Sequence, residues 1–280
     1  MNPNFDPIQY KLNSKANWNI IAFDYHSNWA DRHQGPFKST REIVNIAGIS
    51  PHDKILDLAC GTGAVSKEIM QYLDDDGFLI GVDLSRTALS IAKKSIQNTN
   101  VEFLEMDAEQ LSFNILFDKV LCQYGLMFFP DVEKVLKSVK KILKKDGKLV
   151  IAVHGLPEDV PYFSCIMNPV LKFIPDIRPE GTPTVHRFGD PNNLNKELTK
   201  AGFLNISIKK FNFCYEVDTF EEYWQDYMHS TANSIRAKIE SHGNEIVTQI
   251  KTEAKQNISK YETSSGILFP WSVLIASASK

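Results

Sequence analysis

Residues 57–63 read Asp57-Leu58-Ala59-Cys60-Gly61-Thr62-Gly63, a glycine-rich turn. The turn follows the apolar residues 54–58, which predict a short strand, and it precedes residues 65–73, which predict a helix. Glycine allows positive φ angles and lets a ligand come close to the backbone, so a turn of this kind between strand and helix is typical of nucleotide-cofactor sites. We therefore expect a cofactor at this turn.

Strand and helix patterns alternate on both sides of the turn. The apolar strands are separated by amphipathic helices, which predicts a parallel sheet covered on both faces. Right-handed crossovers then give a doubly wound α/β fold. The predicted strands are 54–58, 78–83, 101–106, 117–122 and 148–154. The predicted helices are 41–48, 65–73, a helix from the N-cap Ser85 to about 97, and one capped by Asp131 and ended by Asp146-Gly147.

The pattern becomes less regular after residue 154. Residues 192–200 predict a helix, 206–213 a strand, 216–262 a polar helical region, and 267–278 a final strand. No independent second core is apparent, so we expect a single domain over 1–280. Its parts are an N-terminal cap (1–40), a cofactor-binding core (41–154), an insertion (155–189), and a C-terminal part (190–280) that holds the helical insertion 215–263.

Three carboxylates stand near the ends of the first three strands. Asp83 lies 20 residues after Gly63, where a carboxylate takes the ribose hydroxyls of an adenosine, and Asp107 can accept from an adenine amine. Asp57 would repel the pyrophosphate of a dinucleotide, but it suits the cationic S-adenosyl-L-methionine (SAM), and Ser66 replaces the third glycine of the dinucleotide fingerprint. Each Asp alone also fits a solvated strand end or a helix cap. Together they favour SAM over a nicotinamide cofactor.

These motifs, with Asp83-Leu84-Ser85 and Asp107-Ala108-Glu109, resemble those of class I SAM-dependent methyltransferases. The segment 122–131, Cys-Gln-Tyr-Gly-Leu-Met-Phe-Phe-Pro-Asp, is similar to the segment after the fourth strand in methyltransferases of ubiquinone and menaquinone biosynthesis. The resemblance implies a Rossmann-like, seven-stranded, mostly parallel sheet with an antiparallel last strand and helical lid insertions.

The resemblance also implies cofactor-binding residues. Asp57, Ala59, Gly61 and Gly63 would line the methionine end of SAM, with Thr62 in the same turn. Asp83 and Leu84 would hold the ribose and flank the adenine, Asp107 and Ala108 would hold the adenine, and Gln123 would lie under the sulfonium.

No catalytic residue is assigned. Methyl transfer from a sulfonium gains much of its rate from positioning, and a base is needed only where the acceptor must lose a proton. His154 at the end of the fifth strand, His26 and His186 are weak candidates for such a base. Their alternatives are a hydrogen bond to loop backbone, packing of a terminal helix, and a surface or structural role, respectively.

The acceptor is expected to be a small, largely apolar molecule. Residues 155–189 and 215–263 carry aromatic side chains, such as Tyr162, Phe163, Tyr223, Trp224 and Tyr227, that pack a core or enclose such a molecule. Two alternatives stay open: a SAM-binding regulatory or scaffold protein without turnover, and a nicotinamide-dependent oxidoreductase.

Composition narrows the partners and the compartment. The 280 residues carry a formal net charge of −3, without the basic excess of nucleic-acid binders. Four cysteines at 60, 122, 165 and 214 show no metal-binding spacing, which favours free thiols, no metal, and a reducing cytoplasm. Residues 1–6 lack the features of a signal peptide, and no apolar run approaches the roughly 18 residues of a membrane span. The oligomeric state and the methylated atom are not predicted.

Overall fold

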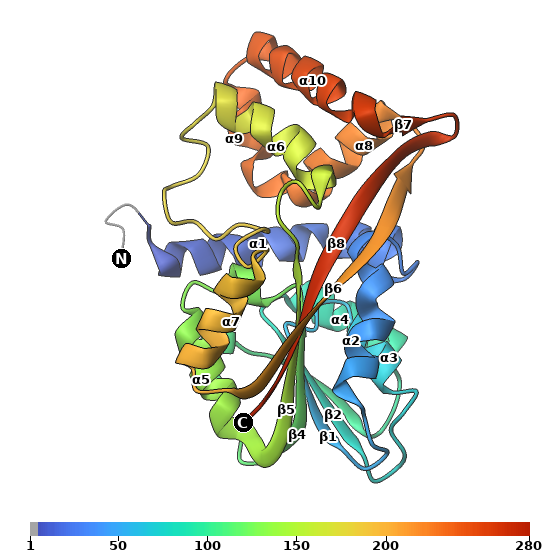
Figure 1. Ribbon diagram of the computed structural model, residues 1–280, viewed down its shortest axis with the longest axis vertical. Helices are drawn as coiled ribbons and strands as arrows, with labels where there is room; N and C mark the ends of the chain where they lie inside the picture. Colours follow the sequence, from blue (N-terminus) through green and yellow to red (C-terminus); the bar gives the residue numbers. More distant parts are fainter. Residues whose placement is uncertain (1–4) are drawn as a thin grey trace.

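The computed structural model describes residues 5–280, so residues 1–4 of the N-terminal stretch weighed as a signal peptide lie outside it. Its centre is a mixed sheet in the order β3-β2-β1-β4-β5-β8-β6, with the short β7 paired to β8 (Figure 1). The strands are β1 (Lys54–Leu58), β2 (Phe78–Asp83), β3 (Val101–Glu105), β4 (Phe117–Gln123), β5 (Leu143–His154), β6 (Leu204–Val217), β7 (Glu262–Thr263) and β8 (Gly266–Ser279).

The first five strands are parallel, and β8 lies antiparallel between β5 and β6. His154 pairs with Val273 on one side of β8, and Phe213 pairs with Trp271 on the other. This arrangement confirms the expected mostly parallel sheet with an antiparallel last strand, and adds the two-residue β7. Parallel pairing also brings the carboxyl ends of β1, β2 and β4 to one edge, where ligands of α/β sheets bind.

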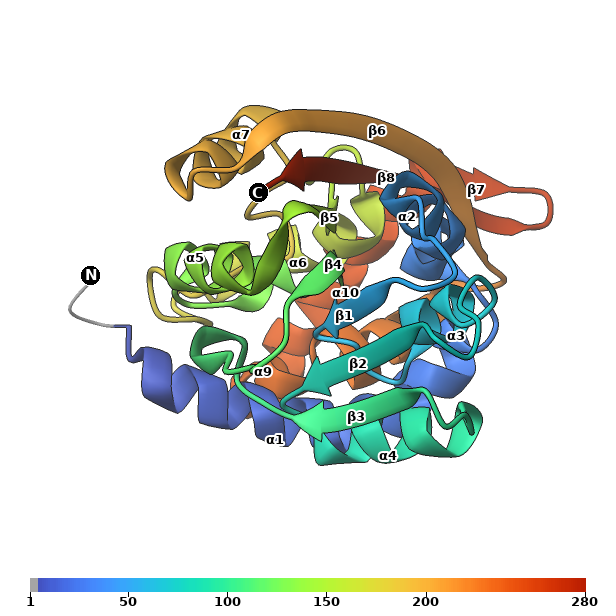
Figure 2. The ribbon, with the colours of Figure 1, turned by 90° about the horizontal axis from the view of Figure 1, so that it is seen from below.

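Helices cover both faces of the sheet, because its central strands are apolar on both sides. α5 (Val132–Ile142) and α7 (Pro191–Lys200) lie on one face, and α2 (Thr40–Ala47) and α3 (Ala64–Ile69) lie on the other, with α4 (Arg86–Ser95) beside β3 (Figure 2). The predicted caps are present: the Ser85 hydroxyl accepts from the Ala88 N–H at 3.1 Å, and the Asp131 carboxylate accepts from the Lys134 N–H at 2.9 Å.

Two predicted helix ends are wrong. α3 ends at Ile69 rather than 73, and α5 ends at Ile142 rather than at Asp146-Gly147. Leu143 continues the apolar spacing of α5 but is extended and pairs with Phe117 in β4. The register then shifts, and regular pairing resumes at Lys148 opposite Lys119. A buried side chain at 143 satisfies both patterns, so spacing alone does not separate helix from strand there.

A helical cap stands above the carboxyl edge of the sheet, and α1 (Pro7–Tyr25) crosses between the two (Figure 1). The long arms of β6 and β8 reach up into this cap. Its helices are α6 (Pro161–Phe173), α8 (Phe220–Asp226), α9 (Asn233–Ser241) and α10 (Asn244–Ile258), with the π-helix η5 (Tyr227–Thr231) between α8 and α9.

The aromatic residues of the cap pack against one another. Tyr162 and Tyr223 are fully buried, and the Tyr223 hydroxyl donates to the Tyr162 carbonyl at 2.6 Å. The Tyr227 hydroxyl donates to the Phe163 carbonyl at 3.3 Å. These side chains therefore form the core of the cap, which is the first of the two roles considered for them.

Residues 5–280 contain no helix that combines the length and the apolar character needed to cross a bilayer. Cys60, Cys122 and Cys165 are buried, Cys214 is exposed, and all four are free thiols.

Candidate functional site

A cavity of about 1120 Å³, its open mouth included, lies at the carboxyl ends of β1, β2 and β4. Its walls include every expected cofactor-binding residue except Gly63, namely Asp57, Ala59, Gly61, Thr62, Asp83, Leu84, Asp107, Ala108 and Gln123. Side chains that are far apart in sequence are thus collected around one space.

The glycine turn forms the floor. Ala59, Gly61 and Gly63 have φ angles of 57°, 54° and 88°, in the region that glycine adopts most readily. Gly63 does not line the cavity but caps α3. A Cβ at Gly63 would lie 3.1 Å from the Cβ of Ala92 in α4, so this glycine lets α4 pack closely beneath the turn.

Asp83 holds the turn in shape. One carboxylate oxygen accepts from the Gly61 N–H at 2.9 Å, and the other accepts from the Ser85 N–H at 2.8 Å. Burial raises the pKa of Asp83, and these backbone N–H groups oppose the shift. Each oxygen keeps a free lone pair, so the carboxylate can still accept hydrogen bonds from a ligand hydroxyl.

Asp57 is buried at 1% exposure and is only partly satisfied. Its Oδ2 accepts from the Ser66 hydroxyl at 2.6 Å, while its Oδ1 has no hydrogen-bond partner among the described residues. Burial raises the pKa of Asp57 to about 7; the Ser66 hydrogen bond opposes this shift, and the charge of Asp83 adds to it. A buried, unpartnered carboxylate oxygen at a cavity wall suits a cationic ligand and opposes a phosphate. The residues present therefore fit SAM.

Asp107 takes part in an ion-pair network with α1, the helix that forms part of the roof of the cavity. Lys11 of α1 places its Nζ 2.7 Å from Asp107 Oδ2 and 3.0 Å from Glu109 Oε2. The other oxygen of Asp107 accepts from the Glu109 N–H at 2.9 Å. Lys11 was not anticipated from sequence; its only signal is its spacing with Lys15 and Asn19, which repeat every four residues and contact the same rim of the sheet.

An aromatic roof closes the rest of the cavity. Trp18 and Tyr25 of α1 pack edge to face at 5.3 Å between ring centroids, and Trp18 reaches Phe128 at 6.2 Å. Phe37 packs on Tyr25 at 5.5 Å, and Tyr124 on Phe37 at 6.4 Å. All five line the cavity. Trp18 and Tyr25 near the N-terminus thus cover the site, whereas the aromatic residues of the cap do not line it.

None of the three candidate histidines lines the cavity. His154 is buried behind Tyr124, on which it stacks at 4.3 Å, and its Nδ1 accepts from the Trp271 indole N–H at 3.3 Å. Burial lowers its pKa well below the usual range. His26 Nδ1 lies 3.0 Å from the Thr62 hydroxyl, and His186 Nδ1 lies 2.7 Å from the Gly155 carbonyl oxygen.

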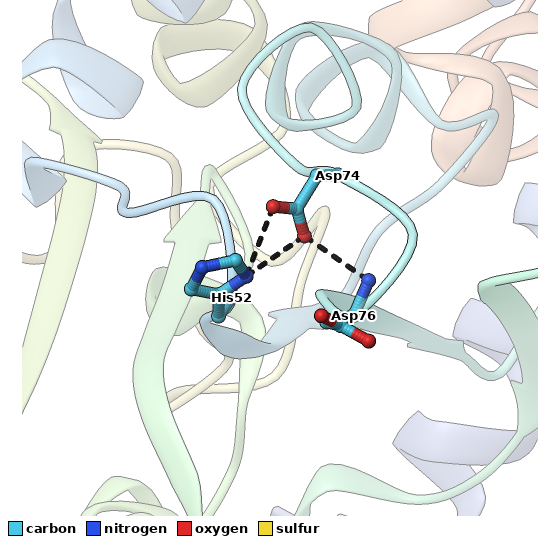
Figure 3. Close-up of side chains that lie close together, drawn as sticks. All are labelled: His52, Asp74 and Asp76. Atoms are coloured by element: carbon cyan, nitrogen blue, oxygen red, sulfur yellow. Dashed lines mark hydrogen bonds and ion pairs between the residues drawn. The ribbon is translucent and has the colours of Figure 1, made fainter.

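A separate polar group lies at the opposite edge of the sheet. His52 precedes β1, and Asp74 and Asp76 precede β2; their potential ligand atoms lie within 4.8 Å of one another, and all three residues are exposed (Figure 3). His52 Nδ1 is 3.0 Å from Asp74 Oδ1. This surface group has no contact with the cavity.

Comparison with known proteins agrees with this geometry. A family model described as "Methyltransferase domain" matches residues 49–179. Among solved structures, a protein from Bacillus halodurans C-125 superposes with a TM-score of 0.59 at 22% identity, covering 87% of this chain and 99% of that one. Phosphoethanolamine N-methyltransferase 2 of Haemonchus contortus, solved with SAM, gives a TM-score of 0.53 at 15% identity over 87% of this chain and 52% of its own. These likenesses show the fold.

The chain shares its fold, its glycine turn and, over residues 49–179, its family-model match with class I SAM-dependent methyltransferases, a class whose cofactor is SAM. Within this class it is similar to the UbiE type. It is 30% identical over 158 residues to the ubiquinone/menaquinone biosynthesis C-methyltransferase UbiE of Wigglesworthia glossinidia brevipalpis, covering 55% of this chain but only 58% of that protein. It is 29% identical over 205 residues to the demethylmenaquinone methyltransferase of Lactococcus lactis, covering 68% of this chain and 77% of that one.

Proposed function

We propose that this protein transfers the methyl group of SAM to a small, largely apolar acceptor. The observation that carries the proposal is the composition of one cavity. A wall of three carboxylates, Asp57, Asp83 and Asp107, faces a roof of aromatic side chains. The acidic wall suits a cationic adenosyl cofactor, and the roof suits an apolar partner placed beside it.

The roles of the cofactor-binding residues are part of the proposal. The unpartnered Oδ1 of Asp57 would accept from the ammonium group of SAM, the free lone pairs of Asp83 would accept from the ribose hydroxyls, and Asp107 would accept from the adenine amine. Leu84 and Ala108 would flank the adenine. Gln123, at the end of β4, would stand beside the reacting methyl group.

SAM supplies a methyl group on a positively charged sulfur, which is already a good leaving group. The protein's contribution is to orient the acceptor in line with that methyl and to exclude water, and positioning of this kind is worth up to roughly 7–11 kcal/mol. The aromatic roof does both. Because no candidate histidine lines the cavity, we assign none of them contact with the acceptor.

The acceptor proposed first is a quinone-type ring. The names of two similar proteins refer to ubiquinone and menaquinone biosynthesis or to demethylmenaquinone. A planar ring in the cavity would pack against the exposed sides of Trp18, Tyr25 and Phe128, which line it, and offset or edge-to-face aromatic packing contributes about 0.5–1.5 kcal/mol per pair.

Two broader proposals accompany this function. We propose that the sheet and its helical additions form a single methyltransferase domain, since β6 and β8 complete the same sheet to which β1–β5 belong. We also propose a reducing, cytoplasmic setting, which the four free thiols support.

The test uses purified protein, SAM with a labelled methyl group, and a short-chain demethylmenaquinone, with a lipid extract as a second acceptor source. We expect calorimetric binding of SAM and S-adenosylhomocysteine, and label transfer that is lost in Asp83→Ala. Binding without transfer to any acceptor would support a regulatory SAM-binding protein instead. Absence of binding at millimolar cofactor would refute the proposal altogether.

A further inference from the structure

A buried hydrogen-bond network joins the start of α2 to the end of β4. The Gln123 side-chain Nε2 donates to Ser39 Oγ at 3.0 Å, and the Thr40 hydroxyl donates to Gln123 Oε1 at 3.1 Å. Ser39 Oγ also lies 2.7 Å from the Tyr124 hydroxyl. All four residues of this network, Ser39, Thr40, Gln123 and Tyr124, are at most 8% exposed, so water does not compete for the hydrogen bonds.

The network holds a strained piece of backbone. Tyr124 has a φ of 58°, in the left-handed region, which is unfavourable for a residue with a side chain. Its hydroxyl donates to the Pro36 carbonyl at 2.8 Å, and its ring stacks on His154. A Cβ at the following Gly125 would lie 2.6 Å from the Cβ of Ala59, so this bend presses directly against the cofactor turn. Strain kept by surrounding contacts is typical of functional positions.

The network also decides which way the Gln123 amide faces. An amide offers two N–H groups and two lone pairs on oxygen, and the network uses one of each. Ser39 Oγ lies 2.8 Å from the Pro36 carbonyl and can give it the hydroxyl proton, so it accepts from the amide nitrogen. The oxygens of Ser39, Tyr124 and Pro36 lie within 2.8 Å of one another and share two hydroxyl protons, and a flipped amide would take the Ser39 proton and leave only one for these three contacts. Gln123 lines the cavity and keeps one N–H and one lone pair that the network does not use. Ser39 and Thr40 do not line the cavity.

We propose that Ser39 and Thr40 are positioning residues that fix the Gln123 amide at the methyl-transfer site. The proposal rests on the proposed SAM cofactor, but not on the identity of the acceptor. An amide held in one orientation presents a constant dipole to a cationic methyl group, whereas a freely rotating amide would turn its N–H groups toward that charge for part of the time. Ser39 and Thr40 therefore act through Gln123.

The test needs no acceptor. SAM labelled with ¹³C in its methyl group is bound to the protein, and the bound methyl resonance is recorded by NMR for Thr40→Val, Thr40→Ser, Gln123→Ala and the double variant Thr40→Val/Gln123→Ala. We expect the Thr40→Val resonance to move toward that of Gln123→Ala, the Thr40→Ser resonance to stay with the wild type, and the double variant to equal Gln123→Ala, because coupled residues are not additive. Thr248→Val, on the exposed face of α10, is the matched control.

Turnover provides a second readout once an acceptor is found. Loss of one hydrogen bond to the amide should lower kcat by about 5–10-fold and leave the affinity for S-adenosylhomocysteine within about threefold. If thermal melting shows that Thr40→Val does not fold, Ser39→Ala replaces it with the same expected shift. A wild-type resonance in a folded Thr40→Val or Ser39→Ala, or additive effects in the double variant, would overturn the proposal. Absence of any bound resonance in the wild type would instead refute the proposed cofactor.

Discussion

Lys11 Nζ lies 2.7 Å from Asp107 Oδ2, and this ion pair ties the roof helix α1 to the adenine end of the candidate cofactor site. Only Ile21 and Ala22 among the 19 residues of this helix are buried, and its partly buried Trp18 and Tyr25 pack on Phe128 and Phe37. Lys15 pairs with Glu105, and the Asn19 side chain accepts from the Ser85 hydroxyl at 2.9 Å and the Thr87 N–H at 3.1 Å. An element held by polar contacts with little apolar burial opens more easily than the core.

Lys11→Met should therefore speed cofactor exchange. A partly exposed ion pair is worth at most about 1 kcal/mol, so the dissociation rate of S-adenosylhomocysteine should rise by about three- to fivefold. Stopped-flow fluorescence of the nearby Trp18 measures this rate. Lys137→Met, which removes an exposed pair with Glu133 on α5, is the control and should leave the rate unchanged. Equal rates in Lys11→Met and wild type, at low and at high salt, would show that α1 does not limit exchange.

Asp83→Ala should weaken cofactor binding for two reasons. It removes a carboxylate that can accept from the ribose, and it releases the Gly61 N–H that shapes the turn. Charge-assisted hydrogen bonds contribute about 1.5–3 kcal/mol, so calorimetry should show S-adenosylhomocysteine binding at least tenfold more weakly. Asp118→Ala removes a carboxylate at the opposite edge of the sheet, where it pairs with Lys144, and should leave the affinity as in the wild type. Similar losses in both variants would point to general destabilisation.

The central part of the fold follows from sequence because its signals are local. The strands 54–58 and 78–83 have the predicted bounds, since buried parallel strands read as continuous apolar runs and a turn stands at each end. The carboxylates at 57, 83 and 107 also end strands of one sheet, so their convergence follows from the topology. The boundary at Leu143 was not predictable, because one buried side chain serves both helix and strand.

The contacts that hold the roof of the site could not be predicted, because they span long stretches of sequence. Lys11 and Asp107 are 96 residues apart, and Ser39 and Gln123 are 84 apart. Aromatic residues occur both near the N-terminus and in the cap, yet Trp18 lines the cavity while Tyr162 packs in the hydrophobic core. Only packing in three dimensions distinguishes the two groups.

His154→Phe should change the pH dependence of stability. Burial lowers the pKa of His154 in the folded state, so the unfolded chain binds the proton more readily below its ordinary pKa near 6.5. Stability is therefore complete above that pH and falls as the pH drops below it, by at most about 1.4 kcal/mol per pH unit. Urea unfolding between pH 4.5 and 8 should show a shallower loss in the variant. Some slope remains, because burial also lowers the pKa of His186.

The same variant loses the hydrogen bond from Trp271, so its free energy of unfolding at pH 8 should be lower by roughly 1–3 kcal/mol. An identical pH slope in variant and wild type would mean that His154 is protonated equally in the folded and unfolded states, against its burial.

Asp57→Asn should stabilise the ligand-free protein and weaken its binding of the cofactor. Burial raises the pKa of Asp57 to about 7 in the folded state, above the ordinary value of the unfolded chain. Its contribution to stability is therefore complete below the unfolded pKa near 3.9 and is lost as the pH rises through about 7. A neutral amide avoids this loss, so at pH 8 the variant should be more stable by roughly 1–3 kcal/mol, while at pH 5 the gain should be much smaller.

Cofactor affinity should change in the opposite direction. Ionised Asp57 attracts an ammonium group, so wild-type affinity for S-adenosylhomocysteine should fall between pH 8 and pH 6, and the variant should bind weakly at both. Asp118→Asn is a control with the opposite expected effect. Partial burial raises the pKa of Asp118, but the Lys144 ion pair and the hydrogen bond from the Lys54 N–H together outweigh burial and lower the pKa overall, so this variant should be less stable at pH 8. A destabilised Asp57→Asn that binds the cofactor normally would assign Asp57 to the fold alone, through its bond to Ser66.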